Sequence, residues 1–440
     1  MTSRRVVSFL YFFTFWAAAC QGRFLAIFFR DLGLSNGEVG YLLAAGSATG
    51  LAATPIWAGV CDYLQGKKKV LEANILCSSL CVCLYLIPYA IPFLHSGTLL
   101  FTWTLLARCT YSFFFTPVFT ILDTLSVQNL EDPKRNYGKC RLWGAVSWGL
   151  VNALFLGPLL DFVGSWTMVV GFLMASVVLF AVIHLMLFER KKQGEPAKDS
   201  ASSLGTYEQF DVGEAEEGEK RAEEEKDKTW NRFSFNHLRG VVQQVLQIVW
   251  AEKLESLSFF VTFYVLGIGT SLVEGLVFLF FTQDLGANNF LCGITVVVTV
   301  LFEIPIFNHS DWILKHINVH VLVVIGAISY IVRVVCYTLF KNPWFVLFVE
   351  PLHGVTYACM QLAGVHYAAE LAPKGLETST QGLKDTVRGL GHITGTVLGG
   401  IIMDVWGSVF MYRSAAALVT ATITLYAMIQ GCGSKKSQQT

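Results

Sequence analysis

The chain of 440 residues is 54% hydrophobic and 14% aromatic, and only 15% of its residues are charged. An ordinary soluble domain is about 25% charged, so a soluble fold of this size would leave too much apolar surface in water. Thirty-two basic and thirty-two acidic residues cancel. This balance leaves no excess charge to favour nucleic acid or a basic partner.

Most of the eleven cysteines lie inside apolar stretches, where we expect small core residues and not disulfides. No Cys-x-x-Cys pair is matched by a second pair or by clustered histidines. The sequence therefore predicts no metal site and no cofactor.

An apolar run of about twenty residues can cross a bilayer. Cutting such runs at Gly, Pro and charge clusters predicts an all-α membrane protein of twelve transmembrane helices in two pseudo-symmetric six-helix bundles. The first run carries Arg23 and no small-residue cleavage site, so we expect a retained helix and not a signal peptide. The segments are 6–30, 38–62, 70–92, 98–122, 142–162, 166–188, 257–282, 288–309, 317–340, 344–371, 379–402 and 409–430.

A highly charged segment separates the two sets of six helices. Residues 189–239 are too charged to bury, which predicts a solvated, largely disordered cytosolic linker. The predicted bundles are 1–188 and 240–430, and the second begins with an amphipathic surface segment at 240–256. Residues 431–440 form a predicted cytosolic tail.

Lysine and arginine accumulate in short loops on one side of the predicted membrane. Both termini and the linker are therefore expected in the cytosol, where the sequon at Asn308 would stay unmodified. No organellar signal is visible, so the plasma membrane is the default location.

Charged side chains within the predicted helices are candidate site residues, because a charge near mid-bilayer is costly unless it faces a partner or a watery cavity. Arg23, Arg108 and Arg388 also lie within helices, but Arg23 and Arg388 could reach an interface by snorkelling. The candidates are Asp123, Arg141, Glu274, Glu303, Arg333, Glu350 and His353.

Asp123 and Arg141 are predicted to form a bidentate pair that a polar solute can enter and split. The alternative is a structural ion pair between two helices. Trp148 lies two turns beyond Arg141 on the same helix face, where an indole could stack on a sugar ring or a base. Packing is the alternative role for Trp148, as it is for most membrane tryptophans.

Arg333 lies in the middle of a predicted helix and needs a carboxylate inside the bundle, for which Glu303 and Glu350 are the candidates. Glu350 and His353, one turn apart, are predicted to carry a coupling proton, because buried carboxylates and histidines can titrate near neutrality. A static hydrogen-bond network is the alternative. Glu303 could instead cap a helix before Pro305, and Glu274 could simply pack between helices.

Residues 137–149 read Tyr-Gly-Lys-Cys-Arg-Leu-Trp-Gly-Ala-Val-Ser-Trp-Gly. This stretch resembles the helix-five signature of the oligosaccharide and nucleoside proton symporters, the lactose-permease-like branch of the major facilitator superfamily. The resemblance implies that Asp123, Arg141 and Trp148 line the solute cavity.

The resemblance extends to the second half. Arg333 and His353 are spaced like that family's helix-nine arginine and helix-ten histidine, and Glu303 lies in its helix-eight carboxylate region. Residues 351–354 also look like the helix-ten motif of eukaryotic, MFS-1-like members. The family's proton-coupling carboxylate is replaced by Thr356, so our hypothesis moves the proton to Glu350 or Asp123.

Residues 55–62 followed by 66–69 are similar to the superfamily's loop motif after helix two. We expect Asp62, Lys67 and Lys68 to latch one conformation on the cytosolic side through an ion pair and a helix-dipole contact.

Together these patterns predict a secondary active transporter, a proton-coupled symporter that works as a monomer by alternating access. Its partners would be protons, the lipid bilayer and a small polar organic solute such as a sugar or glycoside, a nucleoside or a zwitterionic metabolite. The rival of another class is a non-transporting receptor or scaffold whose working surface is the acidic linker. No filter segment favours a channel, and no catalytic motif favours an enzyme.

Overall fold

The computed structural model describes residues 4–64, 67–91, 97–130, 133–193, 253–372 and 377–437. These ranges are built of helices and their connections, without strands. Residues 194–252, which hold most of the predicted linker and amphipathic segment, lie outside the described residues.

The first half of the chain forms six membrane-crossing units, three of which are interrupted. The second half forms six more, together with the short connecting helix α14. The first half comprises α1 (Arg4–Cys20), α2 (Leu25–Asp31), α3 (Asn36–Leu64), α4 (Lys67–Cys83), η1 (Leu84–Leu86), α5 (Ile87–Ala90), α6 (Gly97–Asn129), α7 (Pro133–Leu150), η3 (Val151–Leu156), α8 (Gly157–Phe162) and α9 (Thr167–Gln193). The second half comprises α12 (Lys253–Gln283), α13 (Asn289–Asn308), α14 (Ser310–His316), α15 (Val319–Tyr337), η4 (Pro343–Phe345), α16 (Val346–Val349), α17 (Pro351–Leu371), α18 (Glu377–Trp406) and α19 (Ser408–Ser437).

The predicted fold class is confirmed. Eleven helical stretches of the described chain are long and apolar enough to cross a membrane. The remaining unit, α18, is the eleventh in chain order; it is longer than most of the others but more polar. It packs between α12 and α3 in the body of the molecule. Packing against these neighbours therefore shields the polar residues of α18 from lipid.

Several predicted segments were shorter than the helices of the structure. α6 continues to Asn129 and α7 already begins at Pro133, where the sequence predicted segments ending at 122 and beginning at 142. Hydropathy locates the ends of an apolar run, whereas the helix itself continues beyond these ends into the aqueous phase. α19 likewise continues to Ser437, through most of the predicted tail.

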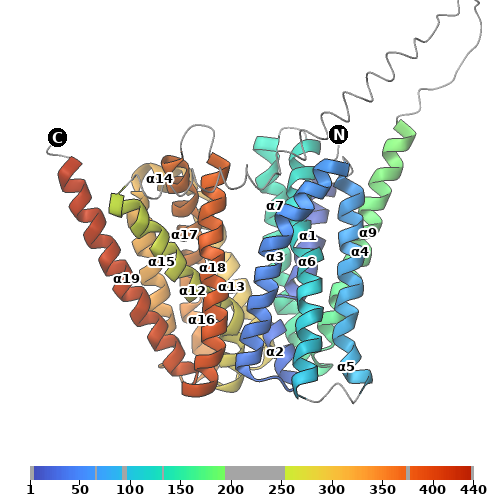
Figure 1. The fold of residues 1–440 in the computed structure, drawn as a ribbon, viewed down its shortest axis with the longest axis horizontal. Coiled ribbons are helices and arrows are strands. Elements are labelled where there is room, and N and C mark those ends of the chain that lie inside the picture. Colours follow the sequence, from blue (N-terminus) through green and yellow to red (C-terminus); the bar gives the residue numbers. More distant parts are fainter. Residues whose placement is uncertain are drawn as a thin grey trace, which may run out of the picture.

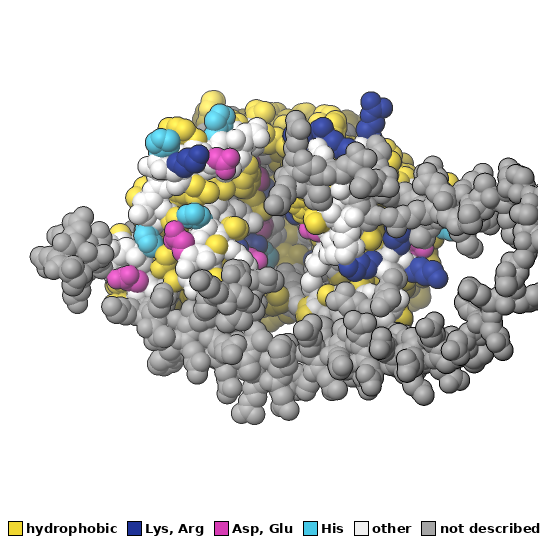
Figure 2. Space-filling model, turned by 90° about the horizontal axis from the view of Figure 1, so that it is seen from above, with side chains coloured by type: hydrophobic (Ala, Val, Ile, Leu, Met, Phe, Trp, Pro, Cys, Tyr) yellow, Lys and Arg dark blue, Asp and Glu magenta, His cyan; other side chains and the backbone are white. Residues whose placement is uncertain are grey.

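The two halves stand side by side, and the beginning of α1 and the end of α19 lie at the same end of the molecule (Figure 1). We call this the terminal end and the opposite one the far end. α3 packs against α18, and α13 packs against η3 and α8, so these elements form the two seams between the halves. Viewed from the terminal end, the molecule is hollowed between the halves, with charged side chains in the depth (Figure 2).

One helix interruption borders this hollow, and two others lie within three residues of side chains that line it. The first transmembrane unit is unwound between α1 and α2, and the fifth contains the π-helical stretch η3. The tenth turns at Glu350, where Pro351 begins α17. Interrupted helices at membrane depth are tolerated where they are buried in protein or line a cavity, and such breaks often mark binding sites in transporters.

A charged cavity between the two halves

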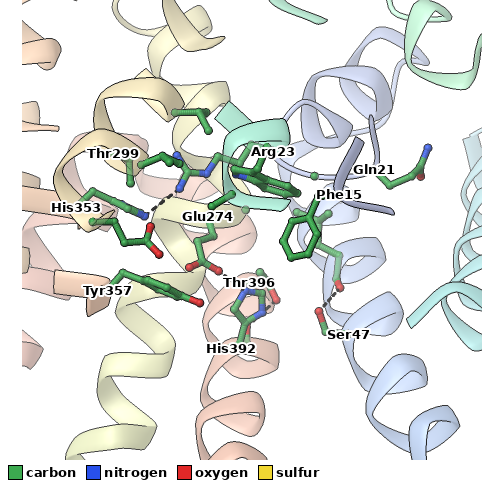
Figure 3. Close-up of a pocket in the computed structure, with 18 of the residues that line it drawn as sticks. Phe15, Gln21, Arg23, Ser47, Glu274, Thr299, His353, Tyr357, His392 and Thr396 are labelled. Atoms are coloured by element: carbon green, nitrogen blue, oxygen red, sulfur yellow. Dashed lines mark hydrogen bonds and ion pairs between the residues drawn. The ribbon is translucent and has the colours of Figure 1, made fainter. Parts of the chain in front are cut away.

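The hollow contains a cavity of about 410 Å³ lined by residues of both halves (Figure 3). This volume falls in the range of about 300–1,000 Å³ that is typical of small-molecule sites. The charged side chains that line it are Arg23, Arg108, Glu274, Glu303 and Arg388, with the histidines His353 and His392.

Arg23 lies on the unwound segment between α1 and α2 and reaches across to the second half. Its Nη2 atom is 2.9 Å from Nε2 of His353 on α17, and the two side chains point toward each other (Figure 3). Only 8% of Arg23 is exposed, so it does not snorkel to an interface as the sequence allowed. The break in the helix places this cation in the cavity wall.

Behind His353 lies a buried polar network within the second half. The other ring nitrogen of His353, Nδ1, contacts Nη1 of Arg333. Glu350 accepts a hydrogen bond from the Tyr337 hydroxyl and another, of 3.1 Å, from the hydroxyl of Thr299. Arg333 and Glu350 are 0% and 1% exposed, so of the predicted trio only His353 faces the cavity.

The wall opposite is formed by α12 and α18. Glu274 of α12 lies 3.7 Å from Nε2 of His392 on α18, and the two side chains meet at the cavity (Figure 3). Arg388 lies one turn before His392, close enough to Glu274 for their charges to interact. Glu303 of α13 also lines the cavity. The sequence offered Glu303 as a candidate partner for Arg333.

Asp123 and Arg141 form an ion pair through one contact of 3.1 Å, between Nη1 and Oδ1, and not through the two contacts of the predicted bidentate pair. Asp123 also accepts a 2.6 Å hydrogen bond from the Tyr11 hydroxyl, and the guanidinium carbon of Arg141 lies 5.4 Å from the centre of the Phe15 ring. Neither member of the pair is among the residues that line the cavity, but Phe15 is. Phe15 therefore contacts both the pair and the cavity.

Trp148 does line the cavity, beside the unwound segment of the first unit. A Cβ atom added to Gly22 would lie 2.7 Å from the Cη2 atom of the indole, so the glycine lets the ring pack against the backbone. The indole presents an apolar face to a cavity that charged side chains also line.

The predicted latch is only partly described. The side chain of Asp62 and residues 65–66 lie outside the described residues, while Lys67 and Lys68 begin α4. The latch therefore stays a prediction.

Sequence reasoning did not select Gln21, Arg108 or His392 for the site. Arg108 lies over Tyr111, with 5.5 Å from its guanidinium carbon to the ring centre, and its Nε and Nη1 atoms donate to no described acceptor. The side-chain oxygen of Gln21 is also buried without a described partner. The signal that could have found Gln21 is the polar triplet Gln21-Gly22-Arg23 within an apolar run.

Comparison with known proteins places the fold in a family. The model of the MFS_1 like family matches residues 5–414. Maltose permease of Geobacillus stearothermophilus is 21% identical over 426 residues, which cover 96% of this chain and 94% of the permease. Major facilitator superfamily domain-containing protein 6-like protein B of Xenopus laevis is 24% identical over 171 residues, 38% of this chain and 28% of that protein.

Solved structures share the fold at low sequence identity. The nucleoside transporter NupG superposes with a TM-score of 0.72 at 12% identity, covering 97% of this chain and 99% of that one. A POT family transporter in complex with 5-aminolevulinic acid gives a TM-score of 0.67 at 13% identity, covering 98% and 96%.

Proposed function

The chain belongs to the MFS_1 like family of membrane transporters, and from this premise we propose that it is a secondary active transporter of a small polar organic solute. The cavity between the halves carries the proposal: five charged side chains line it at membrane depth. Charges in such a place are costly unless water or a polar solute enters.

A sugar or a nucleoside is the first candidate for the solute. The Trp148 indole offers a face on which a ring can stack, and the carboxylates and guanidinium groups around it can bind hydroxyl groups. The names of two relatives, a maltose permease and a nucleoside transporter, support this choice. A zwitterionic metabolite is the next candidate, because the cavity holds charges of both signs.

We further propose that the bundles 1–188 and 240–430 rock about this cavity in a monomer, with a proton as the coupling ion. The terminal end would face the cytosol, since lysine and arginine accumulate there. The conformation described would then be inward-open, with its cavity accessible from the cytosol. The plasma membrane is the proposed location.

The experiment is uptake into proteoliposomes with an imposed pH gradient, using maltose, uridine and 5-aminolevulinic acid as probes. The variant is Glu274→Gln, and its matched control is Glu370→Gln on α17, whose side chain is 55% exposed and pairs with His366 at 3.4 Å. We expect one probe to accumulate with the wild type and with Glu370→Gln, but not with Glu274→Gln.

The opposite result would support the rival. If no probe accumulates and none raises the melting temperature of the purified protein, a receptor or scaffold with a transporter fold becomes the better interpretation.

A further inference from the structure

Two sequence patterns occur once in each half and meet at the far end of the molecule. The pattern Gly-x-x-x-Asp-x-x-Gly-Ser occupies residues 157–165 and 400–408. The pattern Asp-Leu-Gly-x-x-Asn-x-x-x-Gly occupies residues 31–40 and 284–293. These are corresponding places in the two halves, at the connections on the far side of the membrane.

The Asp of the first pattern binds the beginning of a helix in the other half. Asp161, in the last turn of α8, accepts hydrogen bonds from the backbone N–H groups of Asn289 and Phe290, both at 3.0 Å, as α13 begins. The side-chain amide of Asn289 donates a third, of 2.8 Å, to the same carboxylate.

The second seam repeats this arrangement. Asp404, near the end of α18, accepts hydrogen bonds from the backbone N–H groups of Asn36 at 3.1 Å and Gly37 at 2.5 Å, as α3 begins. The first N–H groups of a helix have no partner within it and carry partial positive charge, so a carboxylate satisfies them well.

Glycines of the same patterns let the helices approach closely enough for these bonds. A Cβ atom on Gly157 would lie 2.8 Å from the carbonyl oxygen of Asn289, and one on Gly400 would lie 2.5 Å from that of Asn36. Gly293 and Gly40 are equally tight, against the carbonyl oxygens of Asn152 and Thr396. Each seam therefore pairs two glycines with one carboxylate.

Other shared positions of the two patterns act within one half. Asp284 accepts a 2.7 Å hydrogen bond from the Ser408 hydroxyl. The corresponding residues of the first half, Asp31 and Ser165, also lie close enough to interact. These contacts fix the connections from which the seam carboxylates project, and they need not break when the halves separate.

We infer that Asp161 and Asp404 form a paired gate that holds the far end shut while the cavity is open at the terminal end. Passage of a solute to the far end requires both carboxylates to release the helices of the opposite half. Because each half moves as a rigid body, weakening either seam favours the same state, in which the far end is open.

The gate can be tested by measuring the distance between the halves at the far end. Spin labels attached through unnatural amino acids at Trp166 and Phe410 are suitable, because these side chains are 46% and 50% exposed at the starts of α9 and α19. The samples are the full chain in lipid nanodiscs, studied by double electron–electron resonance. No solute is needed, so the result is independent of the proposed function.

We expect Asp161→Asn and Asp404→Asn each to shift the ratio of long to short distances by on the order of tenfold, since bonds to a charged acceptor are lost at one seam. The double variant should shift it further. Asp284→Asn is the matched control: it removes a carboxylate at the same end whose bond to Ser408 lies within one half, and it should leave the distribution unchanged.

Unchanged distances in both seam variants, with melting temperatures like the wild type, would overturn the inference. A shift in Asp161→Asn alone would also overturn it, because the seams would then act separately. If a variant melts far below the wild type, Asp161→Glu and Asp404→Glu, which keep the charge but lengthen the side chain, provide the same comparison.

Discussion

Arg23 and His353 join the two halves of the chain at the level of the cavity. They are 330 residues apart in sequence, and 2.9 Å separates Nη2 of one from Nε2 of the other. His353 also contacts Arg333 through its second ring nitrogen. Any solute that enters the cavity therefore meets a contact through which a change in one half reaches the buried network of the other.

Arg23→Gln should lower the initial rate of solute uptake at least tenfold, because a neutral amide on a shorter side chain cannot restore the contact with His353. The measurement is uptake in proteoliposomes with the probe that accumulates in the wild type. Arg30→Gln is the matched control, since Arg30 is on the same transmembrane unit and donates to the Leu34 carbonyl outside the cavity. Equal rates in both variants would contradict a role for Arg23.

Glu350→Gln should destabilise the protein by about 3–5 kcal/mol, because it removes the negative charge from a buried cluster that retains Arg333. Glutamine offers a carbonyl oxygen at only one of the two positions that accept from Tyr337 and Thr299, so the loss combines the missing charge with one missing acceptor. Thermal unfolding in detergent measures it, and adding Arg333→Met should restore much of the stability. Stability that is unaffected by Glu350→Gln would show that Arg333 does not depend on this carboxylate.

Gly22→Ala should raise the KM for solute, because the new methyl group would displace the Trp148 indole that it meets at 2.7 Å. The expected change is several-fold, with a smaller effect on the maximal rate. Gly138→Ala on α7 is the control, since a Cβ there meets nothing within 4 Å. An unchanged KM in Gly22→Ala would argue that the indole only packs.

Glu303→Gln should abolish accumulation driven by a pH gradient but leave solute exchange at equal pH, because a neutral side chain cannot release a proton. Glu303 lines the cavity, whereas Glu350 is 1% exposed. Asp123→Asn and Glu350→Gln test the two carboxylates proposed from the sequence. The proton carrier is the residue whose substitution abolishes gradient-driven accumulation but leaves exchange at equal pH. If all three variants still accumulate solute, none of these three residues carries the proton.

Arg141→Ala should cost about 1 kcal/mol or less in stability, since the side chains of Asp123 and Arg141 are 33% and 41% exposed and exposed ion pairs contribute little. Asp123→Ala should cost about 1–3 kcal/mol, because it also leaves the hydroxyl of the buried Tyr11 without this acceptor. If the pair gates the solute, transport should fall far more than stability does. A double-mutant cycle on both quantities separates the roles. Parallel losses in transport and stability would identify a structural ion pair.

The sequence predicted the fold well because hydropathy determines which segments span the membrane. It predicted the site less completely, because the pairing of helices decides which charged faces meet. Arg333 and Glu350 could be recognised as buried charges, but not as a network hidden behind His353. Arg23 was misjudged because periodicity assumes a continuous helix, and the chain unwinds at residues 21–24.

Repeats between the halves are also readable in principle. The two copies of the pattern that contains Asp161 and Asp404 share their spacing but few other residues. The role of each Asp therefore depends on where the copy lies in the folded chain. Internal similarity between residues 1–188 and 240–430 is enough to reveal the patterns, but only the packing of the helices shows that each carboxylate binds the opposite half.

The polarity of α18 has a consequence for how the protein is made. Lys384, Asp385, Arg388 and Asp404 all lie on this helix, which falls short of the apolarity of the other eleven spans. During synthesis such a segment partitions poorly into lipid by itself. We therefore expect its integration to depend on docking against α3 and α12, which are translated earlier. Substitutions in those two helices should therefore cause degradation of the nascent chain even where they spare the mature cavity.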